Sequence, residues 1–366
     1  MKKAVILHPS FWKQAMGGAE LQISYLVQQL LAKGVEVHYI YEDKGISIGD
    51  EQEIHLHPLK KINLKKRFGS RWFLYRKRIN KQLDQIKPDV IYTRFFSSWS
   101  GIASVYAKKH AIRHIWALAS DNDLRALDKP VSLLKPLNIF ERQYVKKAFQ
   151  MAAAILTQNG YQQKALHDKY NRTGVLISQS AELCDASLIK KEGTAITVVW
   201  IANLKTLKRP ELFIDIAKEL AASGNITFKM IGRNNASYVK LIREAEEALP
   251  RFKYLGELKN TEVNEVLCSA DILVNTSDYE GFSNTFVQAW MRKVVVISMN
   301  SNPDDILTKQ GIGFICPEVK EAASKIRELA DHPALITAMG EKAFGYAREH
   351  HSVEKNLQKI LNLMDI

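Results

Sequence analysis

The chain has 366 residues, of which 46% are hydrophobic and 25% are charged, with a formal net charge of +13. This length exceeds one typical core and suits two units of roughly 150 to 190 residues. No apolar run reaches the roughly 18 residues that a membrane-spanning helix needs, so the composition is that of a globular protein and excludes an integral membrane protein. The first residues, Met1 to Pro9, show no signal-peptide pattern, and we expect them to form a buried strand of a cytoplasmic protein.

The positive charge is concentrated in the first half of the chain. Residues 1–191 hold 31 Lys and Arg against 16 Asp and Glu, and the remainder is nearly balanced. The segment Lys60 to Lys81 holds ten basic residues and no acidic one, interleaved with aromatic side chains. This pattern favours a peripheral contact with anionic lipid headgroups, and the alternatives are a solvated basic helix or a nucleic-acid surface. Because no recognisable nucleic-acid-binding motif accompanies it, we expect no nucleic acid among the partners.

The sequence predicts no metal site. Cys184, Cys268 and Cys316 are far apart and lack metal-ligand spacing, so we expect free, buried thiols. No Asp-x-Asp pair with acidic neighbours occurs in the second half of the chain to suggest a divalent ion. We therefore expect no metal and no other cofactor.

Apolar strand-like runs alternate with helical stretches along the whole chain. Continuous β-branched runs of this kind are typical of parallel sheets that are buried on both faces. In the first half, strands are predicted at 4–7, 35–41, 90–93, 114–117, 153–156 and 175–177. In the second half they are predicted at 196–201, 227–231, 272–275, 294–297 and 314–315. The chain therefore predicts an α/β protein of two doubly wound, Rossmann-like domains.

The polar segment 190–194 is the best candidate for a linker between these domains. We expect an N-terminal domain over 1–190 and a C-terminal domain over 191–348. Residues 349–366 carry apolar side chains at helical spacing and predict a terminal helix that docks back toward the N-terminal domain. Because ligands bind beyond the carboxyl ends of parallel strands, two facing domains would hold them in a central cleft.

A glycine pair, Gly17 and Gly18, follows the first predicted strand and opens a helix. Paired glycines let the backbone approach a ligand closely, and a helix start presents free amides to an anion. A phosphate or sugar hydroxyl fits this place, although a Gly-Gly pair before a helix is also an ordinary turn. The sequence is not the G-x-G-x-x-G fingerprint of a dinucleotide site.

Three cations, Lys205, Lys208 and Arg209, follow the first strand of the second domain and precede a helix that begins near Pro210. At the end of a strand they can pair with a diphosphate and offset the charge that grows on it as a sugar departs. The alternative is an ordinary basic surface loop without a binding role.

The segment Asn275 to Trp290, NTSDYEGFSNTFVQAW, is the most specific feature of the chain. A strand ends, a polar turn presents Glu280, and a helix follows whose first amides point to the same place. Gln288 lies eight positions after Glu280 and can also reach a bound ligand. This arrangement is suited to hold both a sugar and a phosphate.

Polar residues also follow two strands of the first domain. Arg94 could receive an anionic acceptor, and Asp121 could orient an acceptor hydroxyl or a donor sugar. Asp after a strand is also a common turn former. The histidines His8, His110 and His114 have no recognisable base and orienter nearby in sequence, so we expect them to be structural or exposed.

The order of these features resembles the family 4 glycosyltransferases. The shared pattern is a Gly-Gly-Ala-Glu loop after the first strand, a Lys before the first helix of the second domain, and Glu-Gly-Phe in a strand-to-helix turn. The resemblance covers most of the chain. It implies a GT-B fold, a nucleotide-diphosphate sugar as co-substrate, with UDP- or GDP-sugars favoured, retention of the anomeric configuration, and no metal ion.

The resemblance also implies roles for individual residues. Glu280 would contact the donor sugar, Lys208 the diphosphate, and Gly17 and Gly18 the donor phosphates or acceptor, while Glu257 would lie near the nucleotide base. With the residues singled out above, the catalytic set is Glu280, Lys208 and Asp121, and the acceptor set is Arg94 and Asp121. The expected donor-binding set is Gly17, Gly18, Asn203, Lys205, Arg209, Glu257, Gly281, Phe282, Ser283, Asn284, Thr285 and Gln288.

Two positions depart from the family pattern. Gln288 stands where the family usually has a second Glu that is assigned to the ribose, and an amide binds hydroxyls less strongly than a carboxylate. Ala202-Asn203 stands where the family tends to have Gly-Arg, so one diphosphate-binding Arg is missing, and Lys205 or Arg209 would have to replace it.

The sequence thus predicts a retaining, metal-independent glycosyltransferase of the hexosyltransferase type. Its acceptor would be a glycan or a lipid-linked molecule at the inner face of a membrane, as in the assembly of bacterial cell-surface polysaccharide or glycolipid. The alternatives are a nucleotide-sugar epimerase of the same fold and a catalytically weak nucleotide-sugar-binding protein. A nicotinamide-dependent dehydrogenase fits poorly, because the Gly-rich fingerprint is absent.

Overall fold

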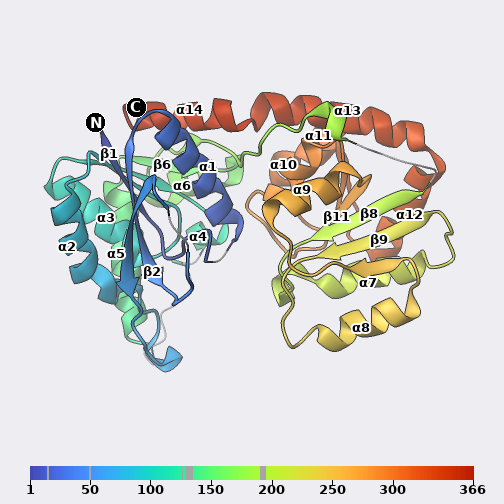
Figure 1. Ribbon diagram of the computed structural model, residues 1–366, viewed down its shortest axis with the longest axis horizontal. Coiled ribbons are helices and arrows are strands. Elements are labelled where there is room, and N and C mark those ends of the chain that lie inside the picture. Colours follow the sequence, from blue (N-terminus) through green and yellow to red (C-terminus); the bar gives the residue numbers. More distant parts are fainter. Residues whose placement is uncertain (15, 49–50, 126, 129–134, 190–194) are drawn as a thin grey trace. The chain divides into compact units, whose positions relative to one another are not determined.

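The protein divides into two compact units, each built on one parallel sheet (Figure 1). The computed structural model describes residues 1–14, 16–48, 51–125, 127–128, 135–189 and 195–366. Unit 1 comprises residues 1–178 and 354–366, and unit 2 comprises residues 179–353. The boundary lies between Ser178 and Gln179, ahead of the expected break at 190–194, and that break lies outside the described residues.

The sheet of unit 1 has the strand order β3-β2-β1-β4-β5-β6-β7 within the described residues, and every neighbouring pair is parallel. The order reverses between β1 and β4, which makes the carboxyl ends of these two strands the topological switch point. The strands are β1 Lys3–Leu7, β2 Glu36–Asp43, β3 Ile54–Lys60, β4 Val90–Thr93, β5 Arg113–Ala117, β6 Ala154–Thr157 and β7 Val175–Leu176.

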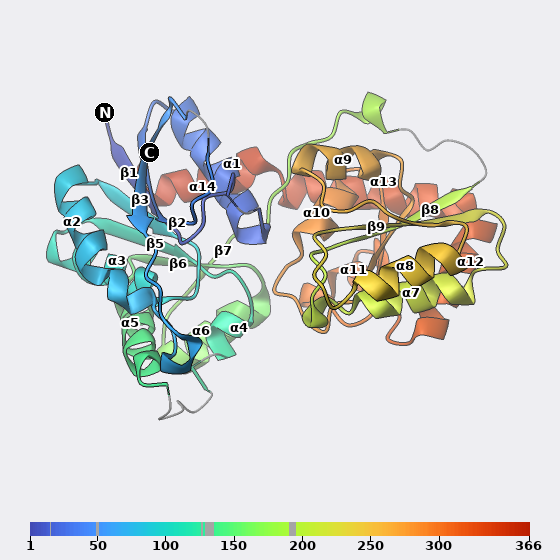
Figure 2. The same ribbon diagram turned by 60° about the horizontal axis from the view of Figure 1, so that its bottom comes forward.

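Helices connect the strands of unit 1 and cover its sheet (Figure 2). They are α1 Gly18–Ala32, α2 Arg76–Ile86, α3 Ser98–Lys109, α4 Asn122–Arg125, α5 Leu137–Met151 and α6 Gly160–Tyr170, with 3-10 turns η1 Lys66–Phe68 and η2 Trp72–Tyr75. Helices α3 and α5 pack so closely that a Cβ added to Gly101 would lie 1.8 Å from the carbonyl oxygen of Tyr144. Glycine is therefore required at this contact.

Unit 2 repeats the design with the order β10-β9-β8-β11-β12-β13 in the part of the chain that the structure describes. All pairs are again parallel, and the order reverses between β8 and β11. The strands are β8 Ile196–Ile201, β9 Ile226–Ile231, β10 Phe252–Tyr254, β11 Ile272–Asn275, β12 Val295–Ser298 and β13 Gly313–Ile315. The helices are α7 Pro210–Glu219, α8 Val239–Ala248, α9 Asn260–Cys268, α10 Asn284–Trp290, α11 Ile306–Lys309, α12 Val319–Asp331 and α13 Pro333–His350, with the 3-10 turns η3 Ala186–Leu188, η4 Thr206–Lys208 and η5 Pro303–Asp305.

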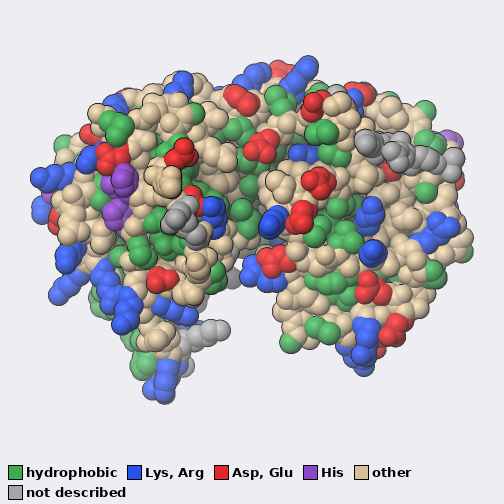
Figure 3. All heavy atoms as spheres, in the orientation of Figure 1, with side chains coloured by type: hydrophobic (Ala, Val, Ile, Leu, Met, Phe, Trp, Pro, Cys, Tyr) green, Lys and Arg blue, Asp and Glu red, His purple; other side chains and the backbone are tan. Residues whose placement is uncertain are grey.

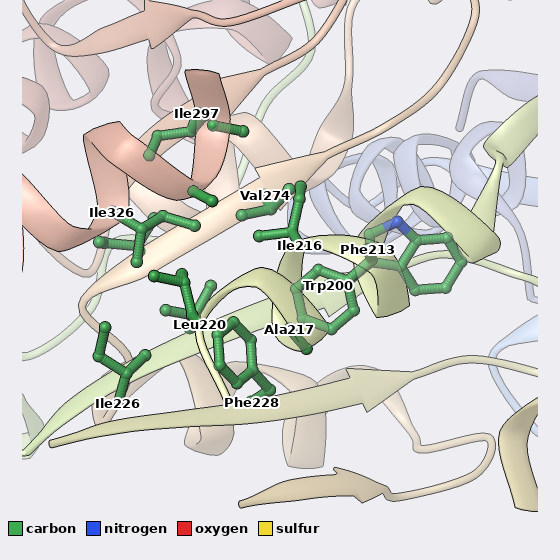
Figure 4. Close-up of a cluster of buried hydrophobic side chains, with 14 of the residues drawn as sticks. Trp200, Phe213, Ile216, Ala217, Leu220, Ile226, Phe228, Val274, Ile297 and Ile326 are labelled. Carbon is green, nitrogen blue, oxygen red and sulfur yellow. The ribbon is translucent and has the colours of Figure 1, made fainter. Parts of the chain in front are cut away.

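The sheet of unit 2 is buried on both faces. Alternate residues of β8 contribute to two different cores: Val198 and Trp200 pack with α7 and α12, whereas Val199 packs with α9, α10 and α13. Figure 4 shows the first core, in which the rings of Trp200 and Phe213 lie beside the aliphatic side chains of the sheet. Burial on both faces explains why these strands are continuous apolar runs.

The last helix, α14 Val353–Leu363, belongs to unit 1. Lys2 donates to the carbonyl oxygen of Asp365, and Arg113 donates to that of Leu363 at 3.0 Å, so the end of the chain is tied to the start of the sheet. The expected single helix over 349–366 is divided, because Glu349 and His350 end α13 and a break precedes α14. No helix in the described part of the chain is both long and apolar enough to cross a bilayer.

Candidate functional site

Lys208 and Glu280 form an ion pair at the switch point of unit 2. Lys208 ends η4, which follows β8, and Glu280 lies in the loop that follows β11. The carboxylate oxygen Oε1 that Lys208 contacts also accepts a hydrogen bond from Ser277 at 2.9 Å and from Asn275 at 3.4 Å. The side chains of Lys208 and Glu280 are 24% and 15% exposed, so both are ordered and still reachable by a ligand.

Hydrogen bonds to the backbone of η4 and to the core hold the two loops together. Thr276 donates to the carbonyl oxygen of Lys208 at 2.6 Å and accepts from the indole of Trp200 at 2.9 Å. The amide of Asp278 donates to the carbonyl oxygen of Leu207 at 3.0 Å. Because Trp200 is buried in the core, these bonds fix the position of the cation and the carboxylate relative to the sheet.

Arg209 is turned toward protein carboxylates. Its guanidinium donates to Glu211 at 3.0 Å and to Asp278 at 3.2 Å, and these hydrogen bonds raise its pKa above the usual value. Its backbone is left-handed, with φ of 47°. Lys205, by contrast, is exposed and stands at the start of η4. Of the two cations expected to replace the missing Arg, Lys205 is the more accessible.

Arg233 is a further candidate for this site that the sequence motifs did not identify. It follows β9, next to β8 in the sheet, and its backbone amide donates to the side chain of Asn203 at 3.2 Å. Its guanidinium pairs with Glu257 at 3.4 Å, and both side chains are about half exposed. The chain therefore places an Arg beside Asn203 after all, supplied by the neighbouring strand. The Gly-Arg dipeptide directly after Ile231 was the available signal.

The turn of Gly281, Phe282, Ser283, Asn284 and Thr285 leads from Glu280 into α10. Phe282 is 4% exposed and its ring packs against Trp290 and His351, so only its backbone can face a ligand. Its carbonyl oxygen accepts a hydrogen bond from Gln179 at 3.2 Å. The hydroxyls of Ser283 and Thr285 lie 2.9 Å apart at the start of α10, which has no side-chain cap at Ser283.

Gln288 is buried on α10 and is bound to α9. Its amide nitrogen donates to the side-chain oxygens of Asn260 at 2.8 Å and Asn264 at 3.1 Å. The residue is only 4% exposed. Three neutral amides therefore meet at the position for which the family resemblance implies a carboxylate.

At the switch point of unit 1, Gly17 and Gly18 lie beside a buried pair that the sequence analysis did not predict. His8, directly after β1, is 2% exposed, and its Nε2 lies 3.3 Å from Oε1 of Glu20 on α1. Burial alone would raise the pKa of Glu20, but the hydrogen bond and charge of His8 outweigh it and lower this pKa. His8 is therefore buried and paired, which fits the structural role expected for it, with a partner twelve residues away in the sequence.

Gly17 and Gly18 start α1 as expected: Gly17 is its extended N-cap and Gly18 its first residue.

The other cluster at this edge of unit 1 is made by Arg94, Asp121 and Asp123. Asp123 accepts hydrogen bonds from the amides of Ala119 at 2.6 Å and Ser120 at 3.2 Å. Burial raises its pKa to about 6, although these amides and the charge of Arg94 act in the opposite direction.

Asp121 is held by amides: it accepts from Asn159 at 3.1 Å and from Gln162 at 2.9 Å. Arg94 is 6% exposed, and it lies near the hydroxyl of Tyr92, at 3.4 Å. Arg94 and Asp121, both expected at the acceptor, thus follow neighbouring strands of one sheet, β4 and β5. The buried carboxyl of Asp123 has a strongly raised pKa.

His110 and His114 are also structural or exposed, as expected. His114 is buried between the hydroxyls of Thr93 at 2.9 Å and Ser104 at 2.7 Å, and burial lowers its pKa to about 3. His110 is exposed at the end of α3. Within the described residues, none of the side chains discussed so far belongs to a group of three metal-ligating residues.

The geometry is thus that of two switch-point sites, each at the carboxyl edge of its own parallel sheet. Unit 2 presents cations and carboxylates suited to a phosphate and a sugar, and unit 1 presents buried, paired polar groups. Sites of this kind bind small polar ligands in doubly wound proteins.

Comparison with known proteins agrees with this geometry. Residues 16–176 match the family described as Glycosyltransferase Family 4, and residues 195–332 match the family described as Glycosyl transferases group 1. The poly(ribitol-phosphate) alpha-N-acetylglucosaminyltransferase of Staphylococcus aureus is 26% identical over 172 residues, which are 45% of this chain and 34% of that relative. The alignment therefore spans about a third of that relative's length.

Solved structures show the same fold over the whole chain. The sucrose-phosphate synthase of Thermosynechococcus elongatus has a TM-score of 0.76 at 12% identity, covering 99% of this chain and 98% of the other. The Anabaena HepE protein, in complex with UDP and glucose, has a TM-score of 0.74 at 16% identity and covers 100% of both chains. The two family matches and this likeness agree: the chain belongs to the family 4 glycosyltransferases and has the GT-B fold.

Proposed function

We propose that the protein is a retaining glycosyltransferase that moves a sugar from a nucleotide-diphosphate donor to a glycan or lipid-linked acceptor without a metal ion. The observation that carries this proposal is the Lys208–Glu280 pair at the switch point of unit 2. A cation for a diphosphate and a carboxylate for sugar hydroxyls are fixed side by side. The names of the relatives support the donor class, since one is an N-acetylglucosaminyltransferase and another was solved with UDP-glucose.

The donor would bind to unit 2. Lys208 would contact the diphosphate, and Lys205 and Arg233 would add positive charge around it. Glu280 would accept hydrogen bonds from the sugar hydroxyls, in place of those it now receives from Ser277 and Asn275. The base would lie near Glu257 and the ribose near Gln288. A UDP-sugar is the donor that the relatives favour.

Transfer would occur on one face of the donor sugar. The acceptor hydroxyl oxygen bonds to the anomeric carbon, the bond from that carbon to the diphosphate oxygen breaks, and the hydroxyl proton passes to the departing diphosphate. The protein's part is to position both substrates and to offset the charge that develops on the leaving group. Lys208 does the latter, and Glu280 orients the sugar.

The acceptor would bind to unit 1, where Gly17, Gly18, Arg94 and Asp121 lie at the carboxyl edge of the sheet. The hydrogen-bonded carboxylate of Asp121 can orient a hydroxyl, and the charge of Arg94 favours an anionic acceptor. Next to the glycines, the hydrogen-bonded pair of His8 and Glu20 would add polar atoms to the acceptor site, and His8 is already buried away from water. Buried polar groups of this kind discriminate strongly between ligands that do and do not complete their hydrogen bonds.

We further propose that the acceptor is presented by the inner face of a membrane. Between Lys60 and Lys81, the basic residues whose side chains the structure describes as exposed are Lys60, Lys61, Lys65, Arg67, Arg76, Lys77, Arg78 and Lys81. Figure 3 shows Lys and Arg side chains along this part of unit 1. Exposed apolar side chains accompany them: Phe68 at 39% and Leu74 at 36%, with Phe140 at 43% stacked on Phe73. Cations around exposed apolar side chains suit the headgroup region of an anionic bilayer.

Thermal unfolding against UDP-, GDP-, ADP- and CMP-sugars, in buffer with EDTA, tests the donor assignment. A ligand at 100 times its dissociation constant adds about 2.7 kcal/mol to the stability of the folded state. We expect one nucleotide to shift the midpoint selectively. Release of the nucleoside diphosphate that needs an acceptor then identifies a transferase, release without an acceptor identifies hydrolysis, and conversion of the donor sugar alone identifies an epimerase. No shift with any nucleotide, together with a shift by NAD, would overturn the proposal.

A further inference from the structure

Three histidines and a glutamate gather at the opposite end of the sheet of unit 1 from the residues discussed above. Glu36 begins β2 and His38 lies two residues later, so both side chains project from the same face of the strand. On the edge strand β3, His55 is the register partner of His38, and His57 follows two residues on. The alternation of the strands therefore brings all four side chains to one face.

The distances within this cluster are short. Nε2 of His38 lies 2.8 Å from Oε1 of Glu36, and Nε2 of His55 lies 3.9 Å from the same oxygen. The rings of His38 and His55 are stacked with centroids 4.7 Å apart. One ligand atom from each of these three residues lies within 4.8 Å of the other two. Histidine side chains are visible on the surface of this part of unit 1, coloured purple in Figure 3.

We propose that Glu36, His38 and His55 bind a divalent transition-metal ion of the zinc class. Two imidazoles and one carboxylate are ligands that Zn²⁺, Ni²⁺ and Cu²⁺ accept, and a water would take the fourth position. Zinc bonds of about 2.0 to 2.1 Å place tetrahedral ligand atoms about 3.4 Å apart. The 2.8 Å and 3.9 Å separations lie on either side of that value, and the ligand atoms of His38 and His55 lie within 4.8 Å of each other, so side-chain rotations would bring the three atoms into place.

His57 completes the arrangement from the second strand. Its Nε2 lies 2.9 Å from Nδ1 of His38. When Nδ1 of His38 carries the proton and donates it to His57, Nε2 of His38 is left as the metal ligand, which is how most metal-binding histidines are oriented.

The exposed side chain of His55 makes the site accessible to an ion from solvent. His38 is 7% exposed and anchors the site, whereas the side chain of His55 is 60% exposed and can swing onto an arriving ion. The nearest competing cation is Lys3, whose Nζ lies 3.7 Å from Glu36 and whose side chain is 39% exposed, so it can move into solvent. A bound ion would cross-link the edge strand β3 to β2. Because the site lies at the amino end of these strands, the role is structural rather than catalytic.

Metal binding to the full-length, untagged chain tests this inference. After treatment with EDTA and its removal, titration calorimetry with ZnCl₂ should show one equivalent bound, and X-ray absorption should show two imidazole nitrogens at about 2.0 to 2.1 Å. The exposed ligand makes His55→Gln a variant that should fold normally, and we expect it to weaken zinc binding tenfold or more. Thermal unfolding without metal verifies its fold.

The matched control is His167→Gln, which removes a histidine that is 68% exposed and also has a carboxylate, Asp168, at 3.5 Å. This control should leave the zinc affinity unchanged. The proposal is overturned if no stoichiometric binding is seen, if His55→Gln binds zinc as tightly as the parent chain, or if both substitutions weaken binding equally.

Discussion

The side chains of Lys208 and Glu280 pair across the two loops that follow the central strands of unit 2, β8 and β11. The two residues are 72 positions apart in the sequence, so local structure does not bring them together. The contact arises because β8 and β11 are adjacent in the sheet and Thr276 ties one loop to the backbone of Lys208. The order of the strands thus creates the site.

Replacing Lys208 with Ala should lower turnover by about 100-fold or more, because the charge that develops on the leaving diphosphate loses its nearest cation. Steady-state rates with a fixed donor and acceptor measure this effect. Lys205→Ala is the control: it removes a cation from the same loop that has greater exposure, and it should change the rate by only a few-fold. Near-normal turnover of Lys208→Ala would refute the assignment.

Glu280→Gln should be coupled energetically to Lys208→Ala. The amide keeps an acceptor oxygen for Ser277 but loses the charge that pairs with Lys208. Donor affinities of both single variants and the double variant form a cycle, and residues in contact give interaction energies of about 0.5 to 3 kcal/mol. Strictly additive effects would mean that the two side chains act on the donor independently.

The stability of unit 1 should depend on the ionisation of Asp123. Its pKa is raised from 3.8 to about 6, mainly by burial, with Arg94 and Asp121 as the charged groups nearby. Between pH 3.8 and about pH 6, the Asp123 carboxyl is protonated in the folded chain and ionised in the unfolded chain. The contribution of Asp123 to the free energy of unfolding is therefore largest below pH 3.8 and is lost as the pH rises through about 6. The two-unit shift corresponds to about 3 kcal/mol at most.

Urea unfolding of Asp123→Asn and the parent chain between pH 4 and pH 7 measures this contribution. The asparagine keeps an acceptor for the amide of Ala119 but cannot ionise. We expect the parent to lose stability relative to the variant as the pH rises. His114 has the opposite effect, because its lowered pKa in the folded chain makes the unfolded chain take up a proton in acid and so lowers stability there. Subtracting the free energy of unfolding of one chain from that of the other removes this effect, which both chains share. A pH-independent difference would show that Asp123 ionises normally.

Gly232→Ala should destabilise unit 2 by about 2 kcal/mol or more. Gly232 has φ of 148°, and a Cβ there would lie 1.7 Å from the carbonyl oxygen of Ala202. The close approach joins the ends of β8 and β9, where Asn203 contacts Arg233. Gly224→Ala is the control, since nothing lies within 4 Å of its added Cβ. Thermal unfolding of both variants tests this, and equal midpoints would contradict it.

The sequence was sufficient to predict the central strands and the edge strands β7 and β13, but not the edge strands β3 and β10. The central strands are continuous apolar runs because helices cover both faces of each sheet, and that pattern is legible without coordinates. Strand β3 was missed because it alternates histidine with apolar residues and contains Pro58, and β10 was missed because only three residues pair. Both missed strands lie at a sheet edge, where one side of the strand lacks a hydrogen-bonded neighbour.

The candidate site was predictable only where it depends on chain order. Lys208, Glu280 and the glycine pair lie in the segments that connect a strand to the next helix, so parallel sheets imply their place at the carboxyl edge. The contact of Arg233 with Asn203 and that of His8 with Glu20 depend on which elements become neighbours. No pattern in the sequence specifies those contacts, because they result from packing between residues that are distant along the chain.

Anionic vesicles should bind the chain through the exposed cations around Phe68. Each Lys or Arg near such a surface is worth about 1 kcal/mol, so the double substitution Lys65→Glu and Arg67→Glu should weaken binding about thirtyfold or more. Raising the salt concentration should weaken binding of the parent chain, because exposed charges are screened. Co-sedimentation with vesicles of mixed zwitterionic and anionic lipid measures both effects.

The control for this experiment changes the same charge elsewhere in unit 1. Lys108 and Lys109 are exposed at the end of α3, and their replacement by Glu alters the net charge by the same amount. Phe68→Ser, which removes an apolar side chain and no charge, should weaken binding at high salt as well, because burial of apolar area in the bilayer does not depend on screening. If the Lys108 and Lys109 variant loses as much affinity as the Lys65 and Arg67 variant, the attraction is a property of net charge, and this segment is not the membrane-facing surface.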